Sequence, residues 1–161
     1  MSKAVMLSIR PKWAEKIVNG EKTIEVRKTR PKLATPFKCY IYCTQPKYPH
    51  EDFILTDYPK PQFYGGGKVI GEFTCDRIYK IDKQAAEEKC GLRVAMTDDE
   101  LHGYLGHCQG YGWHISDLRI YDTPKELSEF TGLRDIKFGA APHEIKRPPQ
   151  SWCYVEAMKD G

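Results

Sequence analysis

The sequence predicts an α+β protein in which a mostly antiparallel β-sheet is surrounded by several short helices. Four or more stretches alternate apolar and polar residues with the period of a β-strand, and stretches with helical spacing separate them. The chain has 161 residues, of which 40% are hydrophobic, so it is long enough for one core and too short for two comfortable ones. We therefore expect residues 1–161 to form a single domain.

The N-terminal part is predicted to contain a buried strand and a short helix. Residues 4–9 are mainly apolar and lead towards Pro11, a residue suited to the first turn of a helix. Apolar side chains at positions 13, 14, 17 and 18 follow with helical spacing, and Gly20 suits the left-handed conformation that ends many helices. The helix is therefore expected at 11–19.

The next strand is expected at residues 23–27, where period-two alternation gives the two faces different chemistry. The apolar side chains face the core and the polar side chains face away from it: Ile24 and Val26 against Thr23, Glu25 and Arg27. Lys22 lies at the turn just before this strand. An amine, a carboxylate and a guanidinium thus lie within a few residues of a helix end, which predicts a polar site.

A third strand is expected at residues 37–43, again with two distinct faces. The alternation divides it into a core-facing set and an exposed set: Phe37, Cys39, Ile41 and Cys43 against Lys38, Tyr40 and Tyr42. Exposed tyrosines on a strand can form a surface on which a base stacks, or they can simply pair across strands. Both interpretations of the two tyrosines are open at this point.

The rest of the chain alternates between irregular segments and further elements. Residues 44–67 are rich in Pro, Tyr, Asp and Gly and are interpreted as a loop-rich insertion, and residues 83–108 as a helical segment. The other expected elements are one long bent strand or two consecutive strands at 68–81, a strand at 115–121, a helix at 123–130, a mixed loop at 134–147 and a closing strand at 151–156.

Positive charge is concentrated in the first third of the sequence. The net charge is +3, yet residues 1–47 contain eleven Lys or Arg and three Glu, a net of +8, and the remainder has a net of −5. Such a segment, with aromatic residues, is typical of proteins that bind phosphate backbones, although a solvated basic surface has the same composition. Because no secretory signal and no run of about 18 apolar residues is found, we expect a cytoplasmic protein without membrane association.

Six cysteines raise the question of disulfides or a metal site: Cys39, Cys43, Cys75, Cys90, Cys108 and Cys153. Without an export signal, reduced thiols are expected. Cys39 and Cys43 would lie about 13 Å apart along a regular strand, too far to share one tetrahedral zinc ion, and the sequence has no CxxC pair. We therefore expect no metal and no cofactor.

The stretch GEKTIEVR, residues 20–27, resembles the G-x-K-x-x-E-x-R signature of ASCH domains, which are similar in fold to PUA, EVE and YTH modules. Further similarity lies at residues 7–11, 69–73, 111–115 and 147–152, whereas 48–64 and 83–108 match least. The chain also looks like the small stand-alone ASCH proteins of Firmicutes and their phages. The resemblance implies a PUA-like β-barrel of mostly antiparallel strands with several short peripheral helices.

One function that the resemblance and the charge imply is a binding module whose partner is RNA, a nucleotide or a modified nucleoside. Aromatic side chains form cages around modified bases in YTH and EVE modules, so two tryptophans join the basic residues as candidates, although either can equally belong to the core. The expected binding residues are Arg10, Lys12, Lys22, Glu25, Arg27, Tyr40, Trp113, His114 and Trp152. The oligomeric state is not predicted.

A second function that the resemblance implies is catalysis. Some small ASCH proteins are similar to amidohydrolases that remove acyl groups from N4-acylated cytidine with a lysine, a threonine and a glutamate. The lysine corresponds to Lys22, but Glu25 stands at the threonine position, so this pair is catalytic only if the carboxylate acts as a general base. The glutamate of the hydrolases would have to be Glu87, Glu88 or Glu100.

Three further interpretations remain. A metal-independent ribonuclease would use Lys22 and Arg27 to stabilise phosphorane charge, although no pair of catalytic histidines is evident. A sponge for a small nucleotide would use the same residues for binding alone. Finally, Lys22, Glu25 and Arg27 could form only a structural ion-pair network, which contributes about 0–1 kcal/mol when it is exposed.

Overall fold

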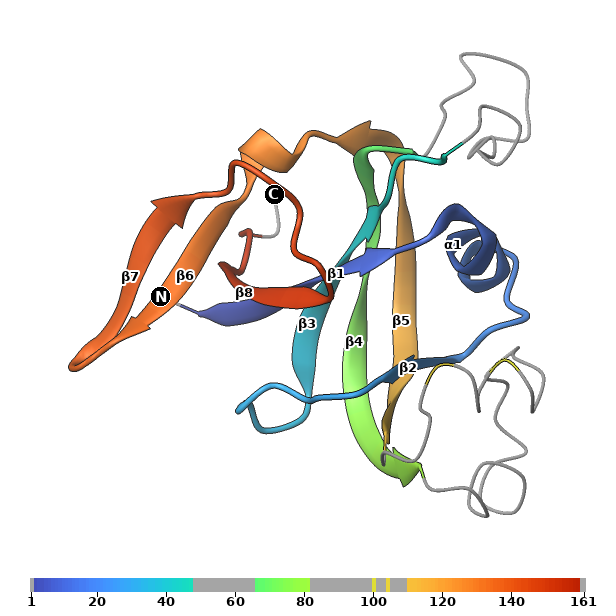
Figure 1. Ribbon diagram of the computed structural model, residues 1–161, viewed down its shortest axis with the longest axis horizontal. Helices are drawn as coiled ribbons and strands as arrows, with labels where there is room; N and C mark the ends of the chain where they lie inside the picture. Colours follow the sequence, from blue (N-terminus) through green and yellow to red (C-terminus); the bar gives the residue numbers. More distant parts are fainter. Residues whose placement is uncertain (1, 48–65, 82–99, 101–103, 105–109, 160–161) are drawn as a thin grey trace.

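A single curved sheet of eight strands forms the body of the protein (Figure 1). The computed structural model describes residues 2–47, 66–81, 100, 104 and 110–159. The strands are β1 Lys3–Ile9, β2 Ile24–Arg27, β3 Phe37–Cys43, β4 Lys68–Ile81, β5 Gly110–Lys125, β6 Thr131–Ile136, β7 Gly139–Glu144 and β8 Trp152–Glu156. Their order in the sheet is β2-β5-β4-β3-β1-β8-β6-β7, and all neighbours are antiparallel except β1 and β3. The predicted α+β class with a mostly antiparallel sheet is confirmed.

The helix α1, Pro11–Val18, connects β1 to β2 close to where it was predicted. Proline starts it, and its buried side chains recur at helical spacing, at Pro11, Ala14 and Ile17. Gly20 follows the helix with φ +82°, a conformation that favours glycine, and the chain then turns into β2. This turn sets the position of Lys22 next to the start of the strand.

The sheet is curled, and its curvature brings the edge strand β2 close to strands that are far from it in the sheet order. The Arg27 guanidinium of β2 donates hydrogen bonds to the backbone oxygens of Ser8 in β1 and of Ser151 just before β8. In the sheet order β1 is four strands away from β2. A side chain, rather than backbone pairing, thus bridges the two sides of a barrel-like fold.

The two faces of β3 pack into two separate cores. Phe37, Cys39, Ile41 and Cys43 belong to the larger core, as predicted. Tyr40 and Tyr42 were expected on an exposed face, but they are 0% and 7% exposed. The prediction is wrong because the second face is covered by residues from distant segments, among them Phe130 and Ile145.

Two predicted elements near the C-terminal end differ from the structure. The helix expected at 123–130 is replaced by the last residues of β5 and a short 3-10 helix, η2 Leu127–Glu129, because Lys125 pairs with Val69 of β4. The loop expected at 134–147 is instead the hairpin of β6 and β7, in which six residue pairs are in register. In both places pairing with another strand overrode the local signals.

Other predictions are confirmed or lie outside the described residues. The stretch 68–81 is one strand, β4, with irregular register against β5, as a bent strand requires. Most of the loop-rich insertion at 44–67 and of the helical segment at 83–108 lies outside the described residues, so the peripheral helices expected there are not described. Among the residues that the structure describes, no helix is long and apolar enough to cross a membrane.

Candidate functional site

A pocket of about 750 Å³ opens between α1, β2, the end of β1 and the segment that precedes β8. Its polar lining includes Ser8, Arg10, Lys22, Glu25, Arg27 and Glu100. The strand β2 contributes its polar face, because residues 25 and 27 lie two positions apart and project to the same side. The signature stretch therefore faces a cavity rather than open solvent.

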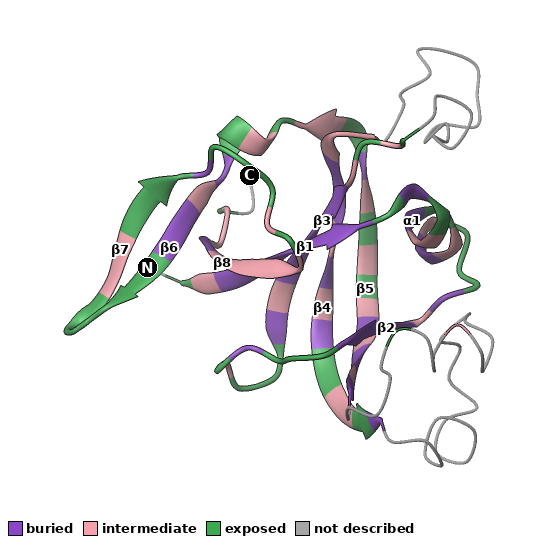
Figure 2. Ribbon diagram, viewed as in Figure 1, coloured by how far each residue is buried: buried purple, intermediate pink, exposed green. Residues whose placement is uncertain are grey.

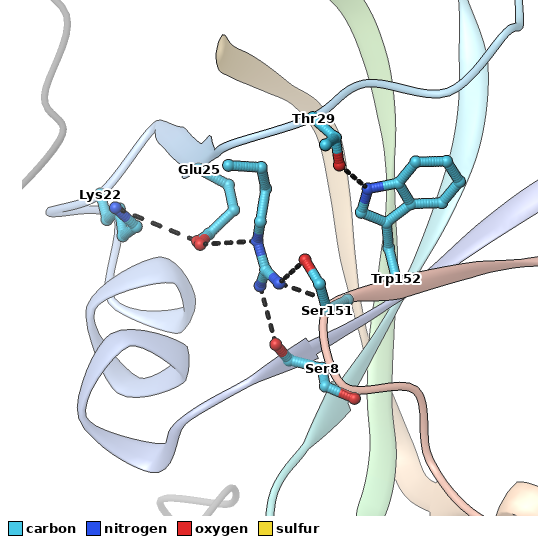
Figure 3. Close-up of polar contacts among 7 residues, drawn as sticks. Ser8, Lys22, Glu25, Thr29, Ser151 and Trp152 are labelled. Carbon is cyan, nitrogen blue, oxygen red and sulfur yellow. Dashed lines mark hydrogen bonds and ion pairs between the residues drawn. The ribbon is translucent and has the colours of Figure 1, made fainter. Parts of the chain in front are cut away.

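Glu25 lies between two of the basic side chains that line the pocket. Its Oε2 atom is 4.0 Å from Nζ of Lys22, and its Oε1 atom is 3.4 Å from Nε of Arg27 (Figure 3). The three side chains are 9%, 1% and 8% exposed, in the order Glu25, Lys22 and Arg27. Glu25 Oε2 is fully buried and has no hydrogen-bond partner among the described residues. A buried acceptor of this kind is costly unless a ligand or water donates to it.

Burial also changes the ionisation of the lysine. The pKa of Lys22 is lowered, first because burial disfavours its charged form, while the nearby Glu25 carboxylate opposes that effect and Arg27 adds to it. Lys22 is therefore closer to neutrality than an exposed lysine. An amine in this state can donate a hydrogen bond to a ligand and, when deprotonated, can accept a proton.

Arg27 has a different role from Lys22, because both of its terminal nitrogens are already used. Nη1 donates to the backbone oxygen of Ser151 at 2.9 Å and to its Oγ at 3.1 Å, and Nη2 donates to the backbone oxygen of Ser8 at 2.7 Å (Figure 3). These bonds fix the distance between β2 and the opposite side of the pocket. Arg27 thus links β2 to the opposite side of the pocket, and its contact with Glu25 also fixes the position of that carboxylate.

Two aromatic side chains complete the pocket lining. Trp13 projects from α1, and the Nζ atoms of Lys22 and Lys12 lie 5.4 and 4.6 Å from its ring centroid. Tyr104 is 38% exposed, and Nζ of Lys28 lies 5.2 Å from its ring centroid. Burial raises the pKa of the Tyr104 hydroxyl, so it stays protonated at neutral pH. The pocket thus combines apolar rings with donors and acceptors.

The sequence model of the ASCH domain matches residues 7–92, more than half of the chain and most of the residues that build this pocket. The chain belongs to the ASCH domain family. None of the curated proteins matches it at a significant level.

Solved structures of ASCH proteins share the fold of this chain. A crystal structure of an ASCH protein from Zymomonas mobilis superposes with a TM-score of 0.65 at 21% identity, covering 95% of this chain and 87% of that one. A serine-to-alanine mutant of the Zymomonas protein gives a TM-score of 0.65 at 20% identity, with 95% and 88% covered. At this identity the likeness establishes the fold alone, which is the one that these ASCH proteins share.

The structure of this ASCH domain brings some of the predicted site residues together and separates others. Arg10, Lys22, Glu25 and Arg27 line one pocket. Lys12 is exposed beside it and pairs with Glu100, Nζ to Oε2, at 3.1 Å. The remaining four predicted residues are not part of the lining.

Each of those four residues has other partners. Tyr40 and Trp113 are both 0% exposed and belong to the two cores. His114 lies on β5, and its Nδ1 is 2.6 Å from Oδ1 of Asp76. Trp152 packs on Trp113 with ring centroids 6.0 Å apart and donates its indole N–H to Thr29 Oγ1 at 2.9 Å. A cage formed by Trp113 and Trp152 is therefore not present at this pocket.

Sequence reasoning missed several residues of the pocket. Trp13 lies on the apolar stripe of the helix and packs against the larger core as expected, but it also lines the pocket, which the lysines around it at positions 12, 16 and 22 could have indicated. Glu100 was one of three candidate glutamates, and it lines the pocket, whereas Glu87 and Glu88 lie outside the described residues. Gln150 and Ser151 lie in the segment 147–152 that resembles ASCH proteins, but no local pattern there or around Tyr104 shows that the fold brings these residues near β2.

The cysteines do not form a second site in the described part of the chain. Cys39, Cys43, Cys75 and Cys153 are free thiols, and burial raises the pKa of Cys75 to about 12 and that of Cys153 to about 11. Thiols with raised pKa values are poor nucleophiles and poor metal ligands. No cluster of three metal-ligating side chains is found among the described residues.

Proposed function

We propose that this ASCH domain binds a nucleobase in the pocket, either as one base of a single-stranded RNA or as part of a free nucleoside. The observation that carries the proposal is the Glu25 carboxylate, whose side chain lines the pocket and one oxygen of which is buried with no hydrogen-bond partner in the described part of the chain. A ligand N–H that donates to this oxygen would remove a penalty of about 1–3 kcal/mol.

The chemistry of the pocket matches the edge and the faces of a base. A base edge presents N–H donors next to ring or carbonyl acceptors, so the Glu25 carboxylate can accept from it while the Lys22 amine donates to it. The rings of Trp13 and Tyr104 offer surfaces for stacking. A cavity of about 750 Å³ is of the size that small-molecule ligands occupy in proteins.

Basic residues near the pocket support binding of a base that is still attached to a phosphate backbone. Arg10 and Lys12 are exposed at the start of α1, and Lys28 is exposed just after β2. Such cations release counterions when they meet phosphates, which makes the affinity depend on salt. The salt dependence therefore separates a polynucleotide from a free nucleoside.

The test is calorimetric titration with a panel of nucleosides and with single-stranded RNA. Glu25→Gln keeps the shape of the side chain but loses the charge, and we expect it to weaken nucleoside binding about 10- to 100-fold, the range for a hydrogen bond to a charged group. Arg119→Ala is the matched control, because Arg119 is an exposed cation on β5 outside the pocket lining, and it should bind like the wild type. Equal affinity of wild type and Glu25→Gln for every ligand contradicts the proposal.

A second candidate function is hydrolysis of an acyl group from an acylated nucleobase. It is favoured by the lowered pKa of Lys22 and by the 4.0 Å separation of its amine from Glu25, because the pair can exchange a proton with a water or an amide. Incubation with N4-acylated cytidine should then release the free acid, and Lys22→Met should abolish the release. Binding of this nucleoside without turnover would leave base binding as the function.

A further inference from the structure

The β6–β7 hairpin carries an unusual pair of exposed apolar side chains at its tip. Phe138 is 88% exposed and Ile136 is 52% exposed, and among the described residues the one further exposed large hydrophobic residue is Tyr104 of the pocket, at 38%. The hairpin projects from the body of the protein, and its outer strand is mostly exposed (Figures 1 and 2). Neither the core nor the pocket accounts for Phe138 at this position.

The surroundings of Phe138 are basic. The Nζ atom of Lys137 lies 5.6 Å from the Phe138 ring centroid. Residues 131–147, which form the hairpin and the segment after it, contain four basic residues and two acidic ones. One of the acidic residues, Asp135, is neutralised by Lys3, Nζ to Oδ1, at 2.5 Å. An aromatic ring within an excess of cationic charge is the combination that binds a stacked base and its phosphate.

The hairpin and the pocket lie at opposite ends of the same strand. The Lys3–Asp135 ion pair holds β6 at the start of β1, and Ser8, near the end of β1, lines the pocket. At about 3.3 Å per residue, the five steps from Lys3 to Ser8 span about 17 Å, and the tip of the hairpin lies beyond Asp135. A stacked nucleic-acid strand, at about 3.4 Å per nucleotide, therefore needs more than about five nucleotides to reach from the pocket to the tip.

A protein partner fits this surface less well than a nucleic acid. β7 is the edge strand of the sheet, but Pro142 in the middle of it removes a backbone donor, which disfavours addition of a strand from a second copy. Two exposed apolar side chains also provide far less area than the roughly 1,000 Å² that a specific protein interface requires.

We infer that the tip of the β6–β7 hairpin is a second contact for single-stranded nucleic acid, in which Phe138 stacks on a base and Lys137 pairs with a phosphate. The inference rests on the proposed function, because the hairpin would hold a strand one base of which occupies the pocket. The pocket then selects the base, and the hairpin adds affinity for longer strands.

The experiment measures fluorescence anisotropy of labelled single-stranded RNA of about 4 and about 12 nucleotides, within the range of known single-strand sites. Phe138→Ala and Phe138→Leu should weaken binding of the longer RNA at least fivefold, the lower end for a lost base stack, whereas Phe138→Tyr should bind like the wild type. Nucleoside binding should be the same in all four proteins. Lys137→Ala should reduce the slope of log affinity against log salt by about 0.7.

Several outcomes would overturn the hairpin contact. Phe138→Ala with unchanged affinity for the longer RNA excludes it, and so does Phe138→Leu with full affinity, since leucine keeps the apolar area without the ring. Sedimentation of the wild type as a dimer and of Phe138→Ala as a monomer, with equal RNA affinity, would assign the tip to self-association instead.

The proposal of base binding in the pocket and the inference of a contact at the hairpin tip can be tested separately. If Glu25→Gln has no effect on any ligand while the Phe138 variants lose affinity, the pocket proposal fails and the hairpin contact stands. If Glu25→Gln weakens binding while the Phe138 variants do not, the reverse holds.

Discussion

Arg27 joins three parts of the chain through one buried guanidinium. It contacts the Glu25 carboxylate, the backbone of Ser8 and both the backbone and side chain of Ser151. An exposed ion-pair network would contribute little, but this one is buried, so the loss of one member leaves other polar groups without partners. The stability of the fold and the shape of the pocket therefore depend on the same side chain.

Replacing Arg27 with alanine should lower the free energy of unfolding by about 3–5 kcal/mol. The buried Glu25 carboxylate loses the guanidinium that pairs with it, and two backbone carbonyls lose their hydrogen-bond donor. Urea denaturation measures the change. Lys12→Ala is the control, since the Lys12–Glu100 pair is exposed and should contribute about 0–1 kcal/mol. A loss below about 1 kcal/mol for Arg27→Ala would show that the guanidinium is not the structural link described above.

The ionisation of Lys22 predicts how stability changes in alkaline solution. Its pKa in the folded protein is lowered from the ordinary 10.5, first by burial. Below the lowered pKa both the folded and the unfolded states hold the proton, so the folded state bears the full cost of burying the charge. As the pH rises towards 10.5, the folded state releases its proton first and this cost disappears.

The wild type should therefore gain stability relative to Lys22→Met as the pH is raised from neutral towards 10.5. The measurement is the difference in free energy of unfolding between the two proteins at several pH values. Lys16→Met on α1, for a lysine that is only partly buried, controls for general effects of removing an amine. A difference that is constant over this range would contradict the lowered pKa.

At the level of the elements, β3 is the clearest case of a strand buried on both faces. Tyr40 sits in the second core with its ring 4.9 Å from that of Phe130, centroid to centroid, and its hydroxyl accepts the backbone N–H of Met158 at 2.7 Å. The hydroxyl thus ties the C-terminal segment to the sheet. Tyr40 is a structural residue rather than a stacking surface.

Tyr40→Phe should lower the free energy of unfolding by about 1 kcal/mol, because the Met158 N–H loses an acceptor. Nucleoside affinity should not change, since the ring stays in place and lies outside the pocket lining. Thermal unfolding and calorimetric titration of the same preparation test both statements. If Tyr40→Phe weakens nucleoside binding and leaves the free energy of unfolding unchanged, Tyr40 is a binding residue and not a structural one.

On the scale of the whole molecule, the three tryptophans occupy different environments. Trp13 lines the pocket, Trp113 is fully buried in the core, and Trp152 packs against Trp113. A ligand in the pocket contacts the first directly and leaves the other two in their packing. Intrinsic fluorescence can therefore report occupancy of the pocket.

Binding of a nucleoside should quench the fluorescence of the wild type, and Trp13→Phe should remove most of this change while it preserves an aromatic wall. Trp152→Phe is the matched control, because Trp152 is not part of the pocket lining and its indole N–H donates to Thr29, so this variant should keep the change. Quenching that persists in Trp13→Phe would locate the ligand away from the pocket.

Several features of this ASCH domain were predictable because their signals are local. The helix at Pro11–Val18, the strands around it and the signature residues 22, 25 and 27 follow from spacing, from a helix-starting proline and from the glycine at position 20. The core face of β3 follows from its alternation. These signals act over a few residues, so the order of amino acids alone determines them.

Only the tertiary structure decided which polar and aromatic residues meet. The amphipathic pattern of β3 does not reveal that Phe130 and Ile145 cover its second face, and the capping signals at 123–126 do not reveal that Lys125 pairs with Val69. Tyr104 and Ser151 line the pocket, whereas Trp113 is buried in the larger core. Burial depends on contacts between residues far apart in the chain, which a local pattern does not encode.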